Sequence, residues 1–241
     1  MPNAKIRVTA ACLLIASLAQ AETGFRNNLN LGLTLTDGNS ETLLGNAAIV
    51  SEGTLAYSSS LRIGAEGNYG ESRIHDEKET TVENARAFAN ARKDVSKRWY
   101  TALNAAANYD NIAAIDYRAL VGPAIGGYIL RREKAILTAE VGPTYMWEKV
   151  DGVSDNFLAL RLAERLEHKL SETAEIWQAA EFIPKAETFD DFLLNAEVGI
   201  SAAMSARMQL RLVLQLKHDS TPADDLKKND ITLISGVGIQ L

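Results

Sequence analysis

Apolar and polar residues alternate along most of this chain with a period of two. In MQLRLVLQLK, residues 208–217, an apolar residue occupies every even position, and four of the five odd positions are polar or charged. Leucine recurs in the same way at positions 29, 31, 33 and 35. Alternation over this length is typical of β-strands that bury one face.

Twelve segments follow this pattern or a weaker form of it. Two of them are ambiguous: NFLALRLAERLEHKL, around the eighth, also satisfies helical spacing, and Glu181 conflicts with either choice of face in the ninth. The predicted strands are 25–36, 41–51, 55–69, 81–92, 99–109, 117–130, 135–147, 157–167, 174–183, 191–202, 208–217 and 230–241.

The connections between these segments alternate between short and long. The first is an exception, because Asp37-Gly38 suits a tight hairpin where a long loop is expected. An even strand count with short turns at one end and longer loops at the other is the layout of a bacterial outer-membrane barrel. No segment after residue 21 is apolar enough for a transmembrane helix, so a membrane-spanning fold must be a barrel. We therefore expect an all-β, antiparallel transmembrane β-barrel of about 12 strands with both termini on the periplasmic side.

A soluble barrel would show the same alternation, but two features favour lipid contact. The apolar faces run for roughly five positions per strand, enough to cross a bilayer at a tilt. Aromatic residues also gather near strand ends, as expected for the two membrane interfaces. They are Trp99 and Trp177 toward the short-turn end, with Tyr69, Tyr109, Tyr117, Tyr145 and Trp147 toward the long-loop end.

The first 21 residues have the features of a secretory signal. Lys5 and Arg7 precede an apolar run too short to span a bilayer, and the run ends in Ala19-Gln20-Ala21. The predicted organisation is a cleaved signal peptide at 1–21 and one barrel domain at 22–241. Cleavage removes the single cysteine, Cys12, and changes the net charge from −6 to −8, so disulfides and cysteine-bound metals are excluded from the mature chain.

Three stretches resemble a known family. They are LTLTDGNSET (33–42), DNIAAIDYRALVGPAIGGYIL (110–130) and DSTPADDLKKNDITLISGVGIQL (219–241). The family is a domain-of-unknown-function group whose members are described as salt-induced outer membrane proteins. The resemblance implies an outer-membrane barrel and brings no established activity or catalytic residue. One difference is the final residue, Leu241, where outer-membrane barrels usually end in an aromatic residue that the barrel assembly machinery recognises.

One arrangement raises the question of enzymatic activity. His218 and Ser220 are two residues apart at the end of the eleventh strand, and Asn229 opens the next one. A serine nucleophile needs a base, and the base needs a partner to orient it, as in lipid hydrolysis on a barrel wall. The simpler interpretation is a turn in which Asp219 and Ser220 cap the local backbone. The turn is favoured, and we expect no enzymatic activity.

The sequence gives little support for zinc, phosphate or nucleic-acid binding. The three histidines lie far apart with no ligand spacing for zinc, and no glycine-rich phosphate loop opens a helix. The acidic charge without a basic stripe argues against nucleic-acid binding, and no cofactor is expected.

The predicted long loops contain more carboxylates than cations. Asp224, Asp225 and Asp230 are examples near the last loop. Such an acidic rim would attract magnesium or calcium weakly, because both ions prefer oxygen ligands. In the membrane, the rim would also lie among the phosphates of lipopolysaccharide. Divalent cations, small ions and outer-membrane lipid are therefore the expected partners.

Inward-facing strand positions show the opposite bias. The predicted register places nine cations against four carboxylates: Arg26, Arg62, Arg86, Arg92, Arg118, Arg161, Arg165, Arg211 and Lys217 against Glu66, Glu140, Glu167 and Glu197. We expect a partly hydrated lumen around Arg86, Arg118 and Arg211, with Glu140 and Glu197 as their partners.

Two roles follow from these charges. A structural barrel for envelope or salt-stress adaptation would pair the charges to fill its interior. The alternative is a narrow pore that prefers small anions.

Overall fold

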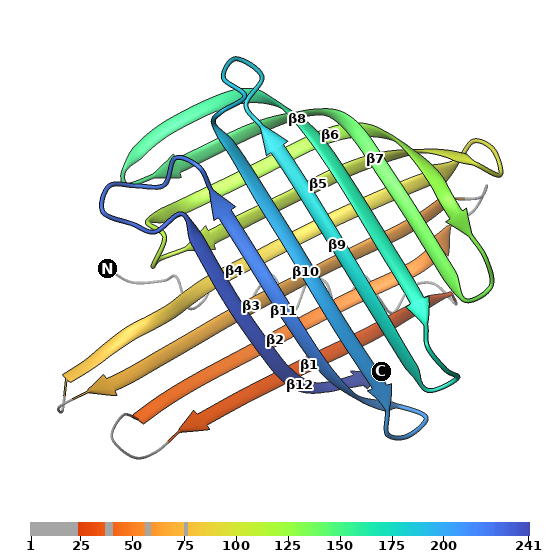
Figure 1. Cartoon of the computed structure of the whole chain (residues 1–241), viewed down its shortest axis with the longest axis horizontal. Coiled ribbons are helices and arrows are strands. Elements are labelled where there is room, and N and C mark those ends of the chain that lie inside the picture. The colour runs from red at the N-terminus through yellow and green to blue at the C-terminus, as the bar shows by residue number, and fades with distance from the viewer. Residues whose placement is uncertain (1–23, 37–40, 56–58, 75–76) are drawn as a thin grey trace.

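The computed structural model describes residues 24–36, 41–55, 59–74 and 77–241, and these form a closed barrel of antiparallel strands (Figure 1). Among the described residues, no helix is long and apolar enough to cross a membrane. The strands are β1 (Phe25–Thr36), β2 (Glu41–Leu55), β3 (Ser59–Ile74), β4 (Glu77–Asp94), β5 (Trp99–Asp110), β6 (Ile115–Arg131), β7 (Ala135–Val150), β8 (Val153–Lys169), β9 (Ala174–Pro184), β10 (Phe192–Ala203), β11 (Met208–Asp219) and β12 (Asn229–Gln240).

The predicted fold class is confirmed, including the number of strands. Each strand pairs with its sequence neighbours, and β1 pairs with β12 to close the ring. The ambiguous segment around residues 157–167 is a strand, not a helix. Both described ends of the chain, Gly24 and Leu241, lie at one end of the barrel, which we call the terminal end; the opposite end is the loop end.

The prediction of a long loop at 70–80 is wrong. The β3–β4 ladder continues to the pair Ile74↔Glu77 after a bulge at Gly70/Glu71. Charged residues occupy much of this extension, so apolar alternation does not mark it as a strand. Strand pairing depends on backbone hydrogen bonds, and a strand with polar residues on both faces remains paired where water reaches both faces.

Side chains separate cleanly into two faces of the wall. Leucines such as Leu33, Leu158 and Leu210 point outward and are more than half exposed. Trp99 and Trp147 also lie outside and exposed, but Trp177 is only 7% exposed. It faces the lumen, so assigning Trp177 to an interfacial belt was wrong. The register of β9 with β8 determines which face Trp177 occupies. The sequence did not predict this face, because Glu181 conflicts with either choice.

Strands β6 and β7 approach each other closely at two Gly-Pro dipeptides. The ladder is interrupted between Val121↔Tyr145 and Ile125↔Val141, where proline removes a backbone donor from each strand. A Cβ at Gly142 would lie 2.0 Å from the Pro123 carbonyl oxygen, and one at Gly122 would lie 2.3 Å from the Pro143 carbonyl oxygen. Only glycine permits this backbone contact.

Candidate functional site

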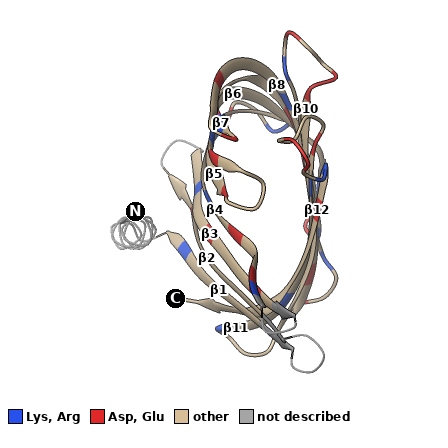
Figure 2. Cartoon of the chain, turned by 90° about the vertical axis from the view of Figure 1, so that its left-hand side faces the viewer, with Lys and Arg blue, Asp and Glu red and all other residues tan. Residues whose placement is uncertain are grey.

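The lumen contains a cavity of about 640 Å³ lined by polar and charged side chains. Its lining begins at the terminal end of the wall, at Gly53 and Ser60, and reaches Leu120 and Lys217 toward the loop end. Figure 2 shows charged residues on both sides of the ring, on β2–β5 and on the opposite strands. The alternation of the strands brings these charges together, because each strand presents every second residue to the lumen.

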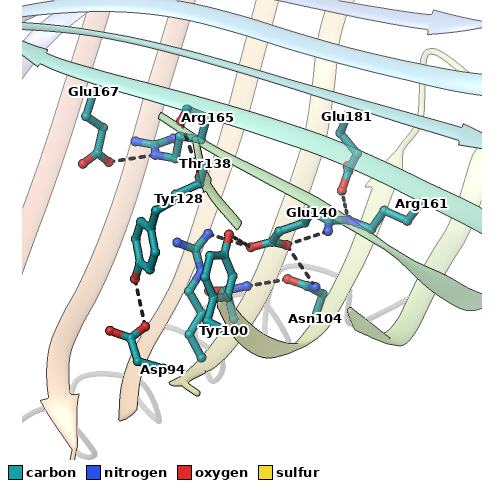
Figure 3. Close-up of polar contacts among 12 residues, drawn as sticks. Asp94, Tyr100, Asn104, Tyr128, Thr138, Glu140, Arg161, Arg165, Glu167 and Glu181 are labelled. Atoms are coloured by element: carbon teal, nitrogen blue, oxygen red, sulfur yellow. Dashed lines mark hydrogen bonds and ion pairs between the residues drawn. The ribbon is translucent and has the colours of Figure 1, made fainter. Parts of the chain in front are cut away.

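Glu140 of β7 is the centre of the polar network in this cavity (Figure 3). Its carboxylate pairs with Arg92 at 2.8 Å and with Arg161 at 2.9 Å, and the Tyr100 hydroxyl donates to it at 3.0 Å. The side chain is only 4% exposed. Asn104 also donates to Glu140. Four partners from β4, β5 and β8 therefore satisfy one buried carboxylate.

A second network lies closer to the terminal end. Arg165 pairs with Glu167 at 2.8 Å and with Glu197 of β10 at 3.7 Å. The Trp177 indole donates to Glu197 at 3.0 Å, and the Arg211 guanidinium lies 4.9 Å from the centre of the Trp177 ring. The inward Trp177 ring therefore contacts a carboxylate through its N–H and a guanidinium through its face.

Two of the predicted lumen arginines have no ion pair within 4.0 Å among the described residues: Arg86 and Arg211. Arg86 lies 5.7 Å from the centre of the Phe88 ring, and its Nε is buried without a hydrogen-bond partner. Glu66, its register partner on β3, forms no ion pair within the described chain either. Unpaired guanidinium groups need water or an anion to satisfy their donors.

The cavity is closer to charge balance than the sequence predicted. Eight cationic and seven acidic residues line it. Six of the seven carboxylates face it, because the alternation of β8 between the inward Arg161 and Arg165 turns the Glu164 side chain to the outer face of the wall. The prediction omitted Glu52 and Glu181 from the lumen. Glu52 pairs with Arg26 at 3.4 Å and Arg62 at 3.8 Å, whereas Glu181 accepts a short hydrogen bond from Arg161. The register of β8 with β9 places Ala163 opposite Glu181 and determines the face of this residue.

Above the cavity, toward the loop end, an apolar layer fills part of the lumen. Leu120, Met146 and Ile183 are at most 8% exposed and pack together with Ala159. Phe157 and Leu193 contact this cluster from β8 and β10. The layer therefore narrows the lumen from the side of β6–β10.

Two ion pairs cross the lumen at the loop end. Arg118 of β6 pairs with Glu148 at 2.6 Å and with Asp219 of β11 at 3.0 Å. Lys217 of β11 lies 3.6 Å from Asp110 of β5, which is six strands away around the ring. The expectation that Arg118 pairs with Glu140 or Glu197 was wrong, because it lies on the other side of the apolar layer.

The connection at residues 185–191 is attached to β8 by Lys185. Its ammonium group lies 2.8 Å from Asp155 and 4.3 Å from the centre of the Phe157 ring. The hydrogen bond to Asp155 raises the pKa of Lys185 above its ordinary value. The Lys185 ammonium group is therefore protonated at neutral pH, and its ion pair with Asp155 attaches the connection to β8.

The acidic rim does not gather into a cation site. Asp224, Asp225 and Asp230 are exposed, and the described residues contain no group of three or more side chains suited to a metal ion. Asp230 faces inward opposite Lys217 instead. Dispersed carboxylates attract counterions only weakly.

The His218–Ser220–Asn229 arrangement is formed only in part. His218 Nδ1 lies 2.7 Å from Asn229 Oδ1, and the imidazole stacks on Phe192. The Ser220 hydroxyl oxygen accepts a hydrogen bond from the Phe192 amide at 2.7 Å, and no hydrogen bond joins it to His218 within the described residues. The geometry is that of a serine that fixes a turn.

A family model described as "Protein of unknown function, DUF481" matches residues 29–240. The chain belongs to this family. No curated protein sequence matches the chain.

Several solved outer-membrane barrels have a similar fold. The NanC porin is 5% identical with a TM-score of 0.54, covering 90% of this chain and 100% of that one. The COG4313 outer membrane channel from Pseudomonas putida F1 is 10% identical with a TM-score of 0.51, covering 90% and 95%. The translocator domain of the autotransporter NalP from Neisseria meningitidis is 12% identical with a TM-score of 0.50, covering 99% and 96%. At these identities the likeness concerns the fold alone.

Proposed function

We propose that the protein is a narrow outer-membrane channel that admits small anions into a charged lumen. The outward leucines would contact lipid, the terminal end would face the periplasm after removal of a signal peptide, and the loop end would lie among lipopolysaccharide. Insertion would require the barrel assembly machinery. The fold is that of outer-membrane barrels, which supports this location.

The single observation that carries the proposal is the state of Arg86 and Arg211. Both line the cavity, and neither has an ion pair within the described chain. Structural arginines in a packed barrel are expected to be paired, as Arg161 and Arg165 are here. An unpaired guanidinium in a water-accessible cavity of about 640 Å³ is instead available to a passing anion.

The narrowing of the lumen at the loop end supports a second candidate function. The apolar layer and the Arg118–Asp219 pair narrow the lumen, and the Glu140 network ties four strands together. These contacts favour the structural role in envelope or salt-stress adaptation that the sequence also predicts. In the channel proposal, the same contacts form the constriction that limits solute size.

Planar-bilayer recording of the purified, folded barrel distinguishes the two functions. We expect discrete current steps in potassium chloride, and a smaller conductance for Arg86→Gln/Arg211→Gln because two anion-attracting charges are removed. Arg207→Gln, in an exposed turn, is the control and should conduct like the wild type. Absence of current from a folded wild-type barrel would leave the structural role.

A further inference from the structure

One charged side chain lies on the outer face of the wall where apolar residues dominate. Glu164 of β8 accepts a short hydrogen bond from the Gln178 amide of β9. Leu162 is outward and 40% exposed, whereas Arg161 and Arg165 on the alternate positions bind carboxylates inside the lumen. The strict alternation of β8 therefore places Glu164 outside.

The surroundings of this pair are apolar and small. Across the ladders, Glu164 lies opposite Ala139 on β7 and Ala180 on β9, and Ala180 lies opposite Ala196 on β10. Val198, the register partner of Gln178, is 45% exposed. On β8–β10, Glu164 is the one carboxylate among the outward residues between Leu158 and the terminal end of the described wall.

The pair also lies deep within the expected apolar band. Glu164 is five residues from Lys169, where β8 ends. At about 3.3 Å per residue and a strand tilt of about 40°, the carboxylate is about 13 Å from the terminal end. The apolar band of such barrels is about 25 Å tall, so Glu164 would lie near its middle, far from either interface.

Hydrogen bonding within the chain leaves part of the pair unsatisfied. The second carboxylate oxygen of Glu164 and the carbonyl oxygen of Gln178 have no partner among the described residues, and the Gln178 amide has a second N–H. Lipid chains offer no hydrogen bonds to these groups. A protein surface placed here would satisfy them.

We infer that the β8–β10 face, centred on Glu164 and Gln178, is the contact surface for a second copy of this chain. An acceptor and a donor on one patch are self-complementary under a twofold axis, so Gln178 of each copy donates to Glu164 of the other. The alanines at 139, 180 and 196 allow the two walls to approach closely. The inference rests on the proposed membrane location and is independent of anion conduction.

Cysteine crosslinking in native outer membranes tests this interface. The chain has one cysteine, Cys12, so Cys12→Ala gives a background without other thiols. Ala180→Cys lies on the proposed axis, and Ala47→Cys is a matched control on β2, an outward position on the opposite side of the ring. We expect a disulfide-linked dimer for Ala180→Cys at several times the yield for Ala47→Cys.

Removing the polar pair gives a second readout. Glu164→Leu/Gln178→Leu, added to Ala180→Cys, should reduce dimer yield to the control level while the barrel still shows heat-modifiable migration on gels. Equal yields at positions 180 and 47, or an unchanged yield without the polar pair, would overturn the interface. Recovery of the protein outside the membrane fraction would overturn both the location and the interface, whereas a dimeric barrel without current would overturn conduction alone.

Discussion

Arg118 and Asp219 join opposite walls of the barrel: Arg118 Nη2 on β6 lies 3.0 Å from Asp219 Oδ2 on β11. The two residues are 101 positions apart in the chain, and their side chains are 12% and 22% exposed. Strands β7–β10 lie between β6 and β11 along the ring, so this pair spans the lumen and fixes its width directly. It lies on the loop-end side of the apolar layer and narrows the lumen further there.

Arg118→Gln should both destabilise the barrel and widen its constriction. Removing one partner of a largely buried pair leaves Glu148 and Asp219 without a cation, at a cost of roughly 3 kcal/mol. We expect a lower midpoint in urea unfolding and a larger single-channel conductance. Arg26→Gln, at a guanidinium that is 72% exposed, should cost less than about 1 kcal/mol. Unchanged conductance with reduced stability would assign the pair a structural role alone.

Glu140→Gln should be among the most destabilising single substitutions in the lumen. The neutral amide leaves the guanidinium groups of Arg92 and Arg161 with too few negative charges in a buried setting. The expected loss is about 3–5 kcal/mol, measured by denaturant unfolding followed with tryptophan fluorescence. Glu133→Gln, in the exposed turn before β7, removes the same charge and should have little effect. Equal unfolding midpoints for the two variants would refute the central role of Glu140.

Some of the lumen residues could be predicted from the sequence, and others could not. Alternation located the strands, because the wall has one apolar and one polar face throughout, and it placed Glu140 and Arg161 inside. It missed Glu181 and misplaced Trp177, since the face of a short strand such as β9 follows from its register with β8. Glu181 could have been recognised as a partner for Arg161, because it is a carboxylate on β9, the strand next to β8.

Pairing across the lumen has no local sequence signal. Whether Arg118 meets Asp219 depends on the shape of the ring and on the stagger of five intervening strand pairs. Neither property is encoded in the alternation of any one strand. The extension of β3 and β4 at the loop end was missed for a different reason. Its residues are largely charged, so they show no apolar alternation, but their backbone groups still form a ladder.

Gly142→Ala should prevent correct assembly of the β6–β7 pair. The new Cβ would lie 2.0 Å from the Pro123 carbonyl oxygen, a backbone atom that cannot move without separating the strands. Gly67→Ala is the matched control, since its Cβ would lie 3.8 Å from the nearest atom. We expect the folded, heat-modifiable form to be lost for Gly142→Ala and retained for Gly67→Ala. A fully folded Gly142→Ala barrel would contradict the close approach.

Ser220→Ala should leave lipid turnover unchanged. The Ser220 hydroxyl accepts from the Phe192 amide, so the substitution is expected to loosen the connection at 185–191 without affecting chemistry. Fatty-acid release from phospholipid vesicles, compared between the wild type and Ser220→Ala, measures this directly. Calcium-dependent release that disappears in the variant would show that His218, Asn229 and Ser220 act as a hydrolase.

The reversal potential of the wild-type barrel in a potassium chloride gradient shows whether the lumen prefers anions to cations. Arg86 and Arg211 are cations without ion-pair partners in the described lumen, so chloride should cross more readily than potassium, and the sign of the potential should report this. Arg211→Glu should shift the potential toward potassium selectivity. A wild-type barrel that conducts with a preference for potassium would refute an anion-attracting role for Arg86 and Arg211.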